Sequence, residues 1–261
     1  MTAVLRFVDV RLVLDGTVAL DGVSWEVGPS ERWVVLGPNG SGKTSLVQLA
    51  CGYQHPTTGT VEVLGHRLGR VDVRRLRRRI GLASASLARQ LRPGITALDV
   101  VLAGRHAALE TWWHSYDDAD RCRAERLLAD AGLADLAGRA FGVLSEGERQ
   151  QVQLARTLMG DPELVLLDEP AAGLDMGGRE QLVTRLAQLA ADKGTSPIVF
   201  VTHHVEEIPA GFTHALLLRQ GRVVAAGPLG ATLTDATLST AFGLPLRLTH
   251  ENGRWSCRAV T

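Results

Sequence analysis

Eight consecutive residues near the N-terminus carry the spacing of a phosphate-binding loop. They read GPNGSGKT, fit the pattern G-x-x-x-x-G-K-[ST] and lie between an apolar run and a segment typical of a helix. Glycines let the backbone curl so that successive N–H groups face inward, and a following helix adds the positive end of its dipole. In such a loop the lysine reaches the β- and γ-phosphates, and the next hydroxyl binds Mg²⁺.

The alternative is a plain glycine-rich turn before a helix. It leaves unexplained why the pattern captures one of only two lysines in the chain, Lys43. We therefore expect phosphate binding at this loop, with Thr44 also a metal ligand. The residues expected to bind are Gly37, Pro38, Asn39, Gly40, Ser41, Gly42, Lys43, Thr44 and Ser45.

A second candidate group is the acidic pair at the end of the apolar run LVLLDEP. Such a run is typical of a strand buried on both faces, and parallel sheets bind their ligands beyond the carboxyl ends of the strands. Asp168 would then lie near Mg²⁺, and Glu169 could polarise an attacking water. Alone, an acidic pair after a strand is usually a helix cap or a turn. Together with the phosphate loop, it predicts a site for nucleotide hydrolysis.

The elements that must position these residues alternate between strand and helix. Short alternating runs up to about residue 30 predict antiparallel strands, and helical patterns dominate from about residue 96 to 159. Later runs predict strands at LVLLDEP and PIVFVTHH, a helix at REQLVTRLAQLAAD and a hairpin at ALLLRQGRVVAAG. The tail after about residue 228 has no distinct pattern. This order predicts an α/β core that carries a helical insertion.

The composition is that of an ordinary globular chain of 261 residues, 45% of them hydrophobic and 21% charged. Its 28 basic and 28 acidic residues cancel, so no net field draws it to nucleic acid. Three distant cysteines predict a reducing compartment without disulfides. The N-terminus lacks a signal-peptide pattern, and no apolar run approaches the roughly 18 residues of a membrane span. We expect a cytoplasmic chain, with a peripheral place on the inner face of the cell membrane open to it.

The segment LSEGERQQVQLARTL discriminates between classes of nucleotide-binding protein. Ser145-x-x-Glu148 matches a capping box, which explains a helix start but not the leucine and glycine around it. Together with GPNGSGKT and LVLLDEP, the segment makes the chain resemble the nucleotide-binding domain of ABC (ATP-binding cassette) ATPases, from about residue 4 to about 228. The family's usual LSGGQ stands here as LSEGE, with Glu146 and Glu148 as departures. Ser145 and Gly147, which the resemblance implies donate to a γ-phosphate, are retained.

The resemblance implies an α/β fold with a P-loop NTPase (RecA-like) core, an antiparallel β subdomain and a helical insertion subdomain. The nucleotide-binding domain would span residues 1–228, with the helical subdomain at about 92–158. A short C-terminal extension would follow at 229–261.

The resemblance also implies further site residues and a partner subunit. AAGLD resembles the family's D-loop and ends at Asp175, and VFVTHH resembles its switch region, with His203 where γ-phosphate is contacted. Glu169 and His203 are thus the implied catalytic pair. The implied homodimer is head-to-tail, so that each ATP lies between the phosphate loop of one subunit and Ser145 and Gly147 of the other.

Two side chains that the resemblance leads us to expect are absent. Leu14 stands where many relatives place an aromatic ring on adenine, so it can pack against the base without a π-face. Ala85 stands where the family's Q-loop has glutamine. That role is lost, moved to Ser84, Ser86 or water, or supplied by Gln90, and we favour the serine or water version.

Two further stretches have structural and functional interpretations. The arginine-rich stretch VRRLRRRIG could bind nucleic acid, but it has no aromatic residues between its arginines. A solvated helix face or a partner contact is therefore favoured. ETWWHSY, at residues 110–116, is either core or a docking patch for a permease.

The resemblance favours the ATPase subunit of an importer for metal chelates, siderophores or molybdate, with a separate permease and, through it, a solute-binding protein. A soluble ABC ATPase that acts as a mechanical clamp is the alternative, and a P-loop kinase does not explain LSEGE, AAGLD and VTHH.

Overall fold

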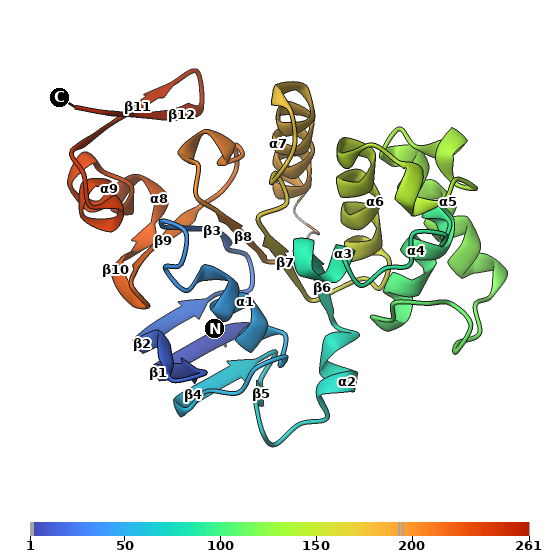
Figure 1. Cartoon of the computed structure of the whole chain (residues 1–261), viewed down its shortest axis with the longest axis horizontal. Coiled ribbons are helices and arrows are strands. Elements are labelled where there is room, and N and C mark those ends of the chain that lie inside the picture. The colour runs from blue at the N-terminus through green and yellow to red at the C-terminus, as the bar shows by residue number, and fades with distance from the viewer. Residues whose placement is uncertain (1–2, 193, 195, 261) are drawn as a thin grey trace.

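Six strands form the central sheet of the protein, in the order β10-β9-β3-β8-β7-β6 (Figure 1). In this computed structural model, the described residues are 3–192, 194 and 196–260. Strands β9, β3, β8, β7 and β6 run parallel, and β10 returns antiparallel beside β9. Their bounds are β3 Arg32–Leu36, β6 Ile80–Ser84, β7 Leu164–Asp168, β8 Ile198–Thr202, β9 His214–Arg219 and β10 Arg222–Pro228.

A second, antiparallel sheet has the order β2-β1-β4-β5. Alternate residues of its long strands are buried, which is the pattern of a sheet with one face on a core. Helix α1 packs into the same apolar core, as do side chains from the central sheet. The bounds are β1 Leu5–Leu14, β2 Thr17–Val27, α1 Lys43–Ala50, β4 Thr58–Val63 and β5 His66–Arg67.

A second apolar core contains side chains of the central strands together with helices and a C-terminal hairpin. Strands β3, β7 and β8 are buried at every position, because both of their faces are covered. The covering elements are α7 Met176–Ala191, η4 Val205–Glu207, α8 Leu229–Thr232, α9 Asp235–Phe242, β11 Leu246–Glu251 and β12 Arg254–Ala259.

The helices on the right of Figure 1 enclose a third apolar core of their own. Helices α4, α5 and α6 contribute most of its side chains, and α6 also packs against β6. The bounds are α4 Ala97–Ala103, η1 Gly104–His106, α5 Asp118–Asp130, η2 Ala134–Leu136, η3 Phe141–Val143 and α6 Glu146–Leu158. These elements fall within the segment predicted to be the helical insertion.

Most longer helices begin at a side chain that accepts a backbone hydrogen bond of the first turn. Such N-caps supply a partner for N–H groups that a helix cannot satisfy internally. The predicted capping box at α6 is confirmed, since Ser145 and Glu148 bond each other's backbone N–H groups. The capped helices are α4 by Thr96, α5 by Asp117, α6 by Ser145, α7 by Asp175 and α9 by Thr234.

The predicted α/β order is confirmed, and two segments hold more structure than their sequences indicated. The residues after β6 form a short helix, α3 Ala85–Ala88, which no sequence pattern indicates. The tail without a pattern forms α8, α9 and the hairpin β11–β12. The arginine-rich stretch includes α2 Val73–Arg77, and the guanidinium of Arg79 forms two bonds to Glu163 at 2.5 and 2.7 Å.

The close contact between β6 and α6 depends on Gly81. A Cβ atom at this position would lie 2.4 Å from the carbonyl oxygen of Thr157 in α6. Gly81→Ala is therefore expected to lower the free energy of unfolding by about 1–3 kcal/mol, as overpacking does. Gly230→Ala is the matched control, because no atom lies within 4 Å of the added methyl group there. Urea denaturation of both variants measures the difference, and equal stabilities would contradict the expectation.

Candidate functional site

The parallel register brings the predicted site residues to one edge of the central sheet. Ser84 pairs with Asp168, and Asp168 pairs with Val201. Leu36, the last residue before the phosphate loop, pairs with Thr202. The phosphate loop, the acidic pair and the switch histidine therefore follow directly from neighbouring strand ends, where parallel sheets bind their ligands.

The phosphate loop has the backbone shape that only glycine allows at two positions. Gly37 has φ 157° and Gly42 has φ 104°. A Cβ atom on Gly37 would lie 2.3 Å from the Leu218 carbonyl oxygen, and one on Gly42 would lie 2.7 Å from that of Ala19. The loop is thus held between β9 and β2, and α1 begins directly after it at Lys43.

Lys43 and Thr44 face the acidic pair. The buried Lys43 ammonium donates to the carbonyl oxygens of Gly37 and Pro38 at 2.9 and 3.0 Å, and it lies 3.5 Å from Glu169 Oε1. The Thr44 hydroxyl donates to Asp168 Oδ1 at 3.3 Å. Two residues next to each other in the loop therefore contact two residues next to each other after β7.

Burial favours the neutral forms of both Asp168 and Lys43. Burial raises the pKa of Asp168 to about 6, and the hydrogen bond from Thr44 opposes that rise. Burial also lowers the pKa of Lys43, against the attraction of Glu169. The site thus holds ionisable groups out of water, which strengthens their interaction with a charged ligand.

Glu169 and His203 lie together beyond the acidic strand. His203 Nδ1 is 3.4 Å from Glu169 Oε1, the same oxygen that Lys43 approaches. Glu169 has φ 49°, a left-handed conformation that is uncommon for a residue other than glycine. Such strained backbone clusters at functional sites. His204 is exposed, and its ring centroid lies 4.1 Å from that of His203 with the two planes tilted by 42°.

The donor chemistry of the site fits a magnesium nucleotide. Ser41 of the loop is 2% exposed, and among the described residues its hydroxyl has no hydrogen-bond partner. The Thr44 hydroxyl and the Asp168 carboxylate are hard oxygen donors of the kind that Mg²⁺ prefers. The residues present therefore fit phosphate groups and one Mg²⁺.

The segment around Ala85 lies between this site and α6. Ser84 caps α3 by accepting from the N–H of Leu87 at 3.2 Å, and its hydroxyl is 3.0 Å from that of Ser86. Ser84, Ser86 and Gln90 line one pocket together with Asp168. Ala85 instead lines a second pocket on the α6 side. All three candidate replacements for glutamine thus share a pocket with the predicted metal ligand.

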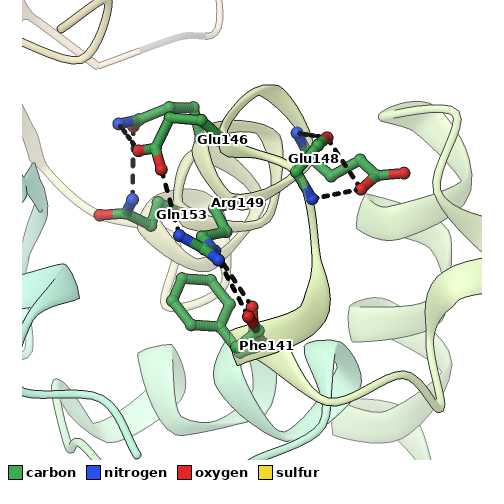
Figure 2. Close-up of polar contacts among 8 residues, drawn as sticks. Phe141, Glu146, Glu148, Arg149 and Gln153 are labelled. Carbon is green, nitrogen blue, oxygen red and sulfur yellow. Dashed lines mark hydrogen bonds and ion pairs between the residues drawn. The ribbon is translucent and has the colours of Figure 1, made fainter. Parts of the chain in front are cut away.

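The segment LSEGE, residues 144–148, leads into the start of α6 and is held by its own polar contacts (Figure 2). Both the N–H and the hydroxyl of Ser145 donate to Glu148 Oε2, at 2.7 and 2.8 Å. Arg149 donates to Glu146 Oε2 at 3.2 Å and to the carbonyl oxygen of Phe141 at 3.3 Å. The two glutamates that depart from the family pattern therefore have structural partners, and Gly147 stays free of side-chain bulk.

Ser145, Gly147 and Asp175 line one groove between α6 and α7, with none of the phosphate-loop residues. Asp175 caps α7 by accepting from the N–H of Gly178 at 2.7 Å. Leu14 ends β1 and packs, partly buried, against the first apolar core. The predicted residues thus divide into a phosphate-loop group and a separate groove on the same chain.

Sequence reasoning missed three polar residues near the site. Gln48 lies one helical turn after Thr44 and lines the pocket with Asp168, a spacing that could have indicated it. Thr202 and Glu207 are buried, and the Thr202 hydroxyl donates to the Glu207 carboxylate. Nothing in the sequence marks that contact, because it forms only when the chain turns back after His203.

The fold and the site define a P-loop nucleotide-binding cassette. A model of the ABC transporter family matches residues 20–172, so the chain belongs to that family, as an ATP-binding subunit. Its overall fold is similar to that of solved ABC cassettes.

Curated relatives match nearly the whole chain. An uncharacterized ABC transporter ATP-binding protein of Bacillus subtilis, YlmA, is 40% identical over 94% of this chain and 93% of its own length. The cobalt import protein CbiO of Rhodobacter capsulatus is 38% identical over 88% of this chain and 80% of its own. The hemin import protein HmuV of Rhodococcus jostii is 35% identical over 94% and 81%.

Solved structures agree with the fold. A metal-chelate type ABC transporter in an inward-facing conformation aligns with a TM-score of 0.76 and 25% identity, over 99% of this chain and 97% of that one. A dimeric cassette bound to ADP and phosphate in a post-hydrolysis state aligns with a TM-score of 0.74 and 25% identity, over 86% and 98%.

Replacing the buried carboxylate is expected to stabilise the protein without nucleotide. Because the pKa of Asp168 in the fold, about 6, exceeds the ordinary value of 3.8, the unfolded chain loses its proton first as pH rises. The fold therefore loses stability between about pH 4 and pH 6, by an amount on the order of 2–3 kcal/mol above that range.

Asp168→Asn removes this loss, so its unfolding free energy should exceed that of the unsubstituted protein at pH 8. The difference should shrink by roughly half at pH 5. Chemical denaturation in EDTA at both pH values measures it. A difference that is equal at the two pH values would show that folding does not raise the pKa of Asp168.

Proposed function

We propose that this chain hydrolyses ATP with Mg²⁺ and thereby powers solute transport through a separate membrane permease. The observation that carries the proposal is the approach of Lys43 and His203 to the same carboxylate oxygen of Glu169. Thr44 and Asp168 are hydrogen-bonded to each other beside it. Phosphoryl transfer to water requires such a grouping of a cation, hard oxygen ligands and a group that orients the water.

Each residue then has a definite task. The loop N–H groups and Lys43 bind the phosphates, and Thr44 and Asp168 would hold Mg²⁺, which supplies charge neutralisation on the phosphate oxygens. Glu169 orients and polarises the attacking water, since its carboxylate is only 28% exposed and lies next to the phosphate loop. His203 lies 3.4 Å from that carboxylate and is placed to contact the γ-phosphate.

The proposal includes a head-to-tail homodimer. Ser145, Gly147 and Asp175 lie in a groove without phosphate-loop residues, so within one chain they serve no ATP. In a second copy turned head to tail, the N–H groups at the start of α6 could face the γ-phosphate, where anions are favoured. The dimeric cassette with ADP and phosphate, to which this chain is similar, supports the formation of a dimer.

We also propose that serine hydroxyls take the place of the missing glutamine. Ser84 is buried, pairs in register with Asp168 and hydrogen-bonds Ser86. The Gln90 side chain donates to the carbonyl oxygen of Ser86 at 3.2 Å, so it supports the serine pair. Leu14 gives the base an apolar contact without stacking.

The permease is proposed to dock on the exposed tryptophans of the helical part. Trp112 and Trp113 are 63% and 73% exposed, and their rings stack with centroids 4.4 Å apart. Exposed tryptophans are enriched at the energetic centres of protein interfaces. Among the described residues no helix is long and apolar enough to cross a membrane. The chain would therefore be cytoplasmic and bound to the inner face of the membrane through that partner.

Transport in the inward direction is part of the proposal. It is supported by the relatives named for cobalt and hemin import, and by the metal-chelate type transporter among the similar structures. A solute-binding protein would then contact the permease on its outer side. The assignment of residues 1–228 to the nucleotide-binding domain, with the helical subdomain at about 92–158 and the extension at 229–261, is proposed on the same basis.

Glu169→Gln is expected to lower steady-state ATP hydrolysis at least about 100-fold, because an amide cannot polarise the water as a carboxylate does. MgATP binding, measured by equilibrium titration, should stay within a few-fold. The variant should also run as a dimer in gel filtration with ATP. Glu163→Gln is the control, since Glu163 bonds Arg79 ahead of β7 and should keep the full rate. Hydrolysis by Glu169→Gln at the unsubstituted rate would contradict the assignment.

Trp112→Ala combined with Trp113→Ala is expected to abolish recovery of the permease. The loss follows because two large apolar contacts leave the interface. The measurement is co-purification of a multispanning membrane protein from the native host with the Glu169→Gln variant in ATP, with and without the tryptophan changes. Leu244→Ala, another exposed apolar residue, is the control. Undiminished recovery would place the docking surface elsewhere.

A further inference from the structure

The C-terminal hairpin reaches the segment that follows the switch histidine. Strand β12 packs against η4, which begins two residues after His203. In the view of Figure 1, the hairpin and α7 lie on the same side of the central sheet. The N–H of Cys257 donates to Glu206 Oε1 at 3.1 Å. The hairpin is therefore in direct contact with the switch region, although Cys257 lies 51 positions beyond Glu206 in the chain.

One side chain of the hairpin joins two elements of the site. Arg254 forms two bonds to the carboxylate of Glu180 in α7, at 2.6 and 3.0 Å. Its Nη2 also donates to the backbone carbonyl oxygen of Glu206 at 2.9 Å. Paired bonds from one guanidinium fix direction as well as distance. Arg254 thus ties α7, which starts at Asp175, to the turn that follows His203.

The same turn is held from inside. The Glu207 carboxylate accepts from Thr202, and the N–H of His204 donates to the Thr202 hydroxyl at 3.1 Å. With Arg254 and Cys257 on the outer side, η4 is bonded on both faces. The backbone that carries His203 to within 3.4 Å of Glu169 therefore has little freedom to shift.

We propose that Arg254 is a positioning residue for hydrolysis, which holds His203 against Glu169 through Glu180 and the backbone of Glu206. The inference rests on the proposed ATP hydrolysis. A side chain that contacts charge in a transition state must be placed within a fraction of an ångström, and small misplacements cost large factors in rate. The hairpin would act on the chemical step and not on binding, since the described contacts of Arg254 include no phosphate-loop residue.

Arg254→Ala is expected to lower kcat about tenfold with the KM for ATP changed less than twofold. Arg254→Lys should recover part of the rate, because an ammonium can still donate to Glu180 or to the Glu206 carbonyl. Arg79→Ala is the matched control. It removes a similar two-bond pair with Glu163, and the exposed fractions are 38% and 52% there against 38% and 46% for Arg254 and Glu180. Exposed ion pairs contribute little to stability, so all variants should fold.

Hydrogen exchange provides a readout that does not depend on activity. Without nucleotide, the amides of residues 204–208 should exchange about tenfold faster in Arg254→Ala than in Arg79→Ala. An unchanged kcat in Arg254→Ala, or an equal loss in Arg79→Ala, overturns the inference while leaving the proposed function intact. If the unsubstituted protein does not hydrolyse ATP, the proposed function fails. In that case unchanged exchange at 204–208 overturns the positioning role, and faster exchange supports it.

Discussion

The site depends on the register in which strands β6, β7, β8 and β3 hydrogen-bond one another. Because these strands are parallel, their carboxyl ends meet at one edge, and residues far apart in sequence become neighbours there. Ser84, Asp168 and Val201 are successive partners across three of the strands. A slip of one residue in any pairing would turn a buried strand's side chains to the opposite face. Since β3, β7 and β8 are buried at every position, such a slip would force the side chains of each face into the core packed around the other, with overpacking at some sites and cavities at others.

This arrangement places ionisable groups where water is excluded, which is unfavourable for the stability of the fold. Asp168 is 7% exposed and Lys43 is 4% exposed. Burial favours the neutral form of each, so it raises the pKa of Asp168 and lowers the pKa of Lys43. Glu169 adds a left-handed backbone. Natural proteins retain such destabilising features where activity requires them. The phosphates and metal of a bound nucleotide would meet groups that are already desolvated and directed, which is the physical basis of preorganised catalysis.

Local patterns sufficed for the parts of the structure that depend on neighbours in sequence. The strand before Gly37, the buried strand to Asp168 and the capping box at Ser145 all follow from spacing within a few residues. The contacts of Arg254 with Glu180 and Glu206 span 74 and 48 positions, and no local pattern marks them. The helix α3 was missed because a four-residue helix is shorter than any periodicity test can detect. Exposure of the tryptophans at 112 and 113 also required tertiary structure, because an apolar cluster looks the same in sequence whether it is core or surface.

Helix α6 connects the surfaces on which the proposed functions lie. Its N-cap, Ser145, lies at the groove shared with α7, and residues between Glu146 and Gln153 line the pocket that Ala85 also lines. Near its end, Arg156 donates to the carbonyl oxygen of Ala108, just ahead of the exposed tryptophans. Two glycines hold this last turn, since a Cβ on Gly104 would lie 2.3 Å from the Arg156 carbonyl oxygen and one on Gly81 would lie 2.4 Å from that of Thr157. A helix clamped so closely moves as one body over its length of about 20 Å. In the proposed docking mode, a displacement passed from the loop of the tryptophans through Ala108 to Arg156 would therefore be carried along α6 to its N-terminus.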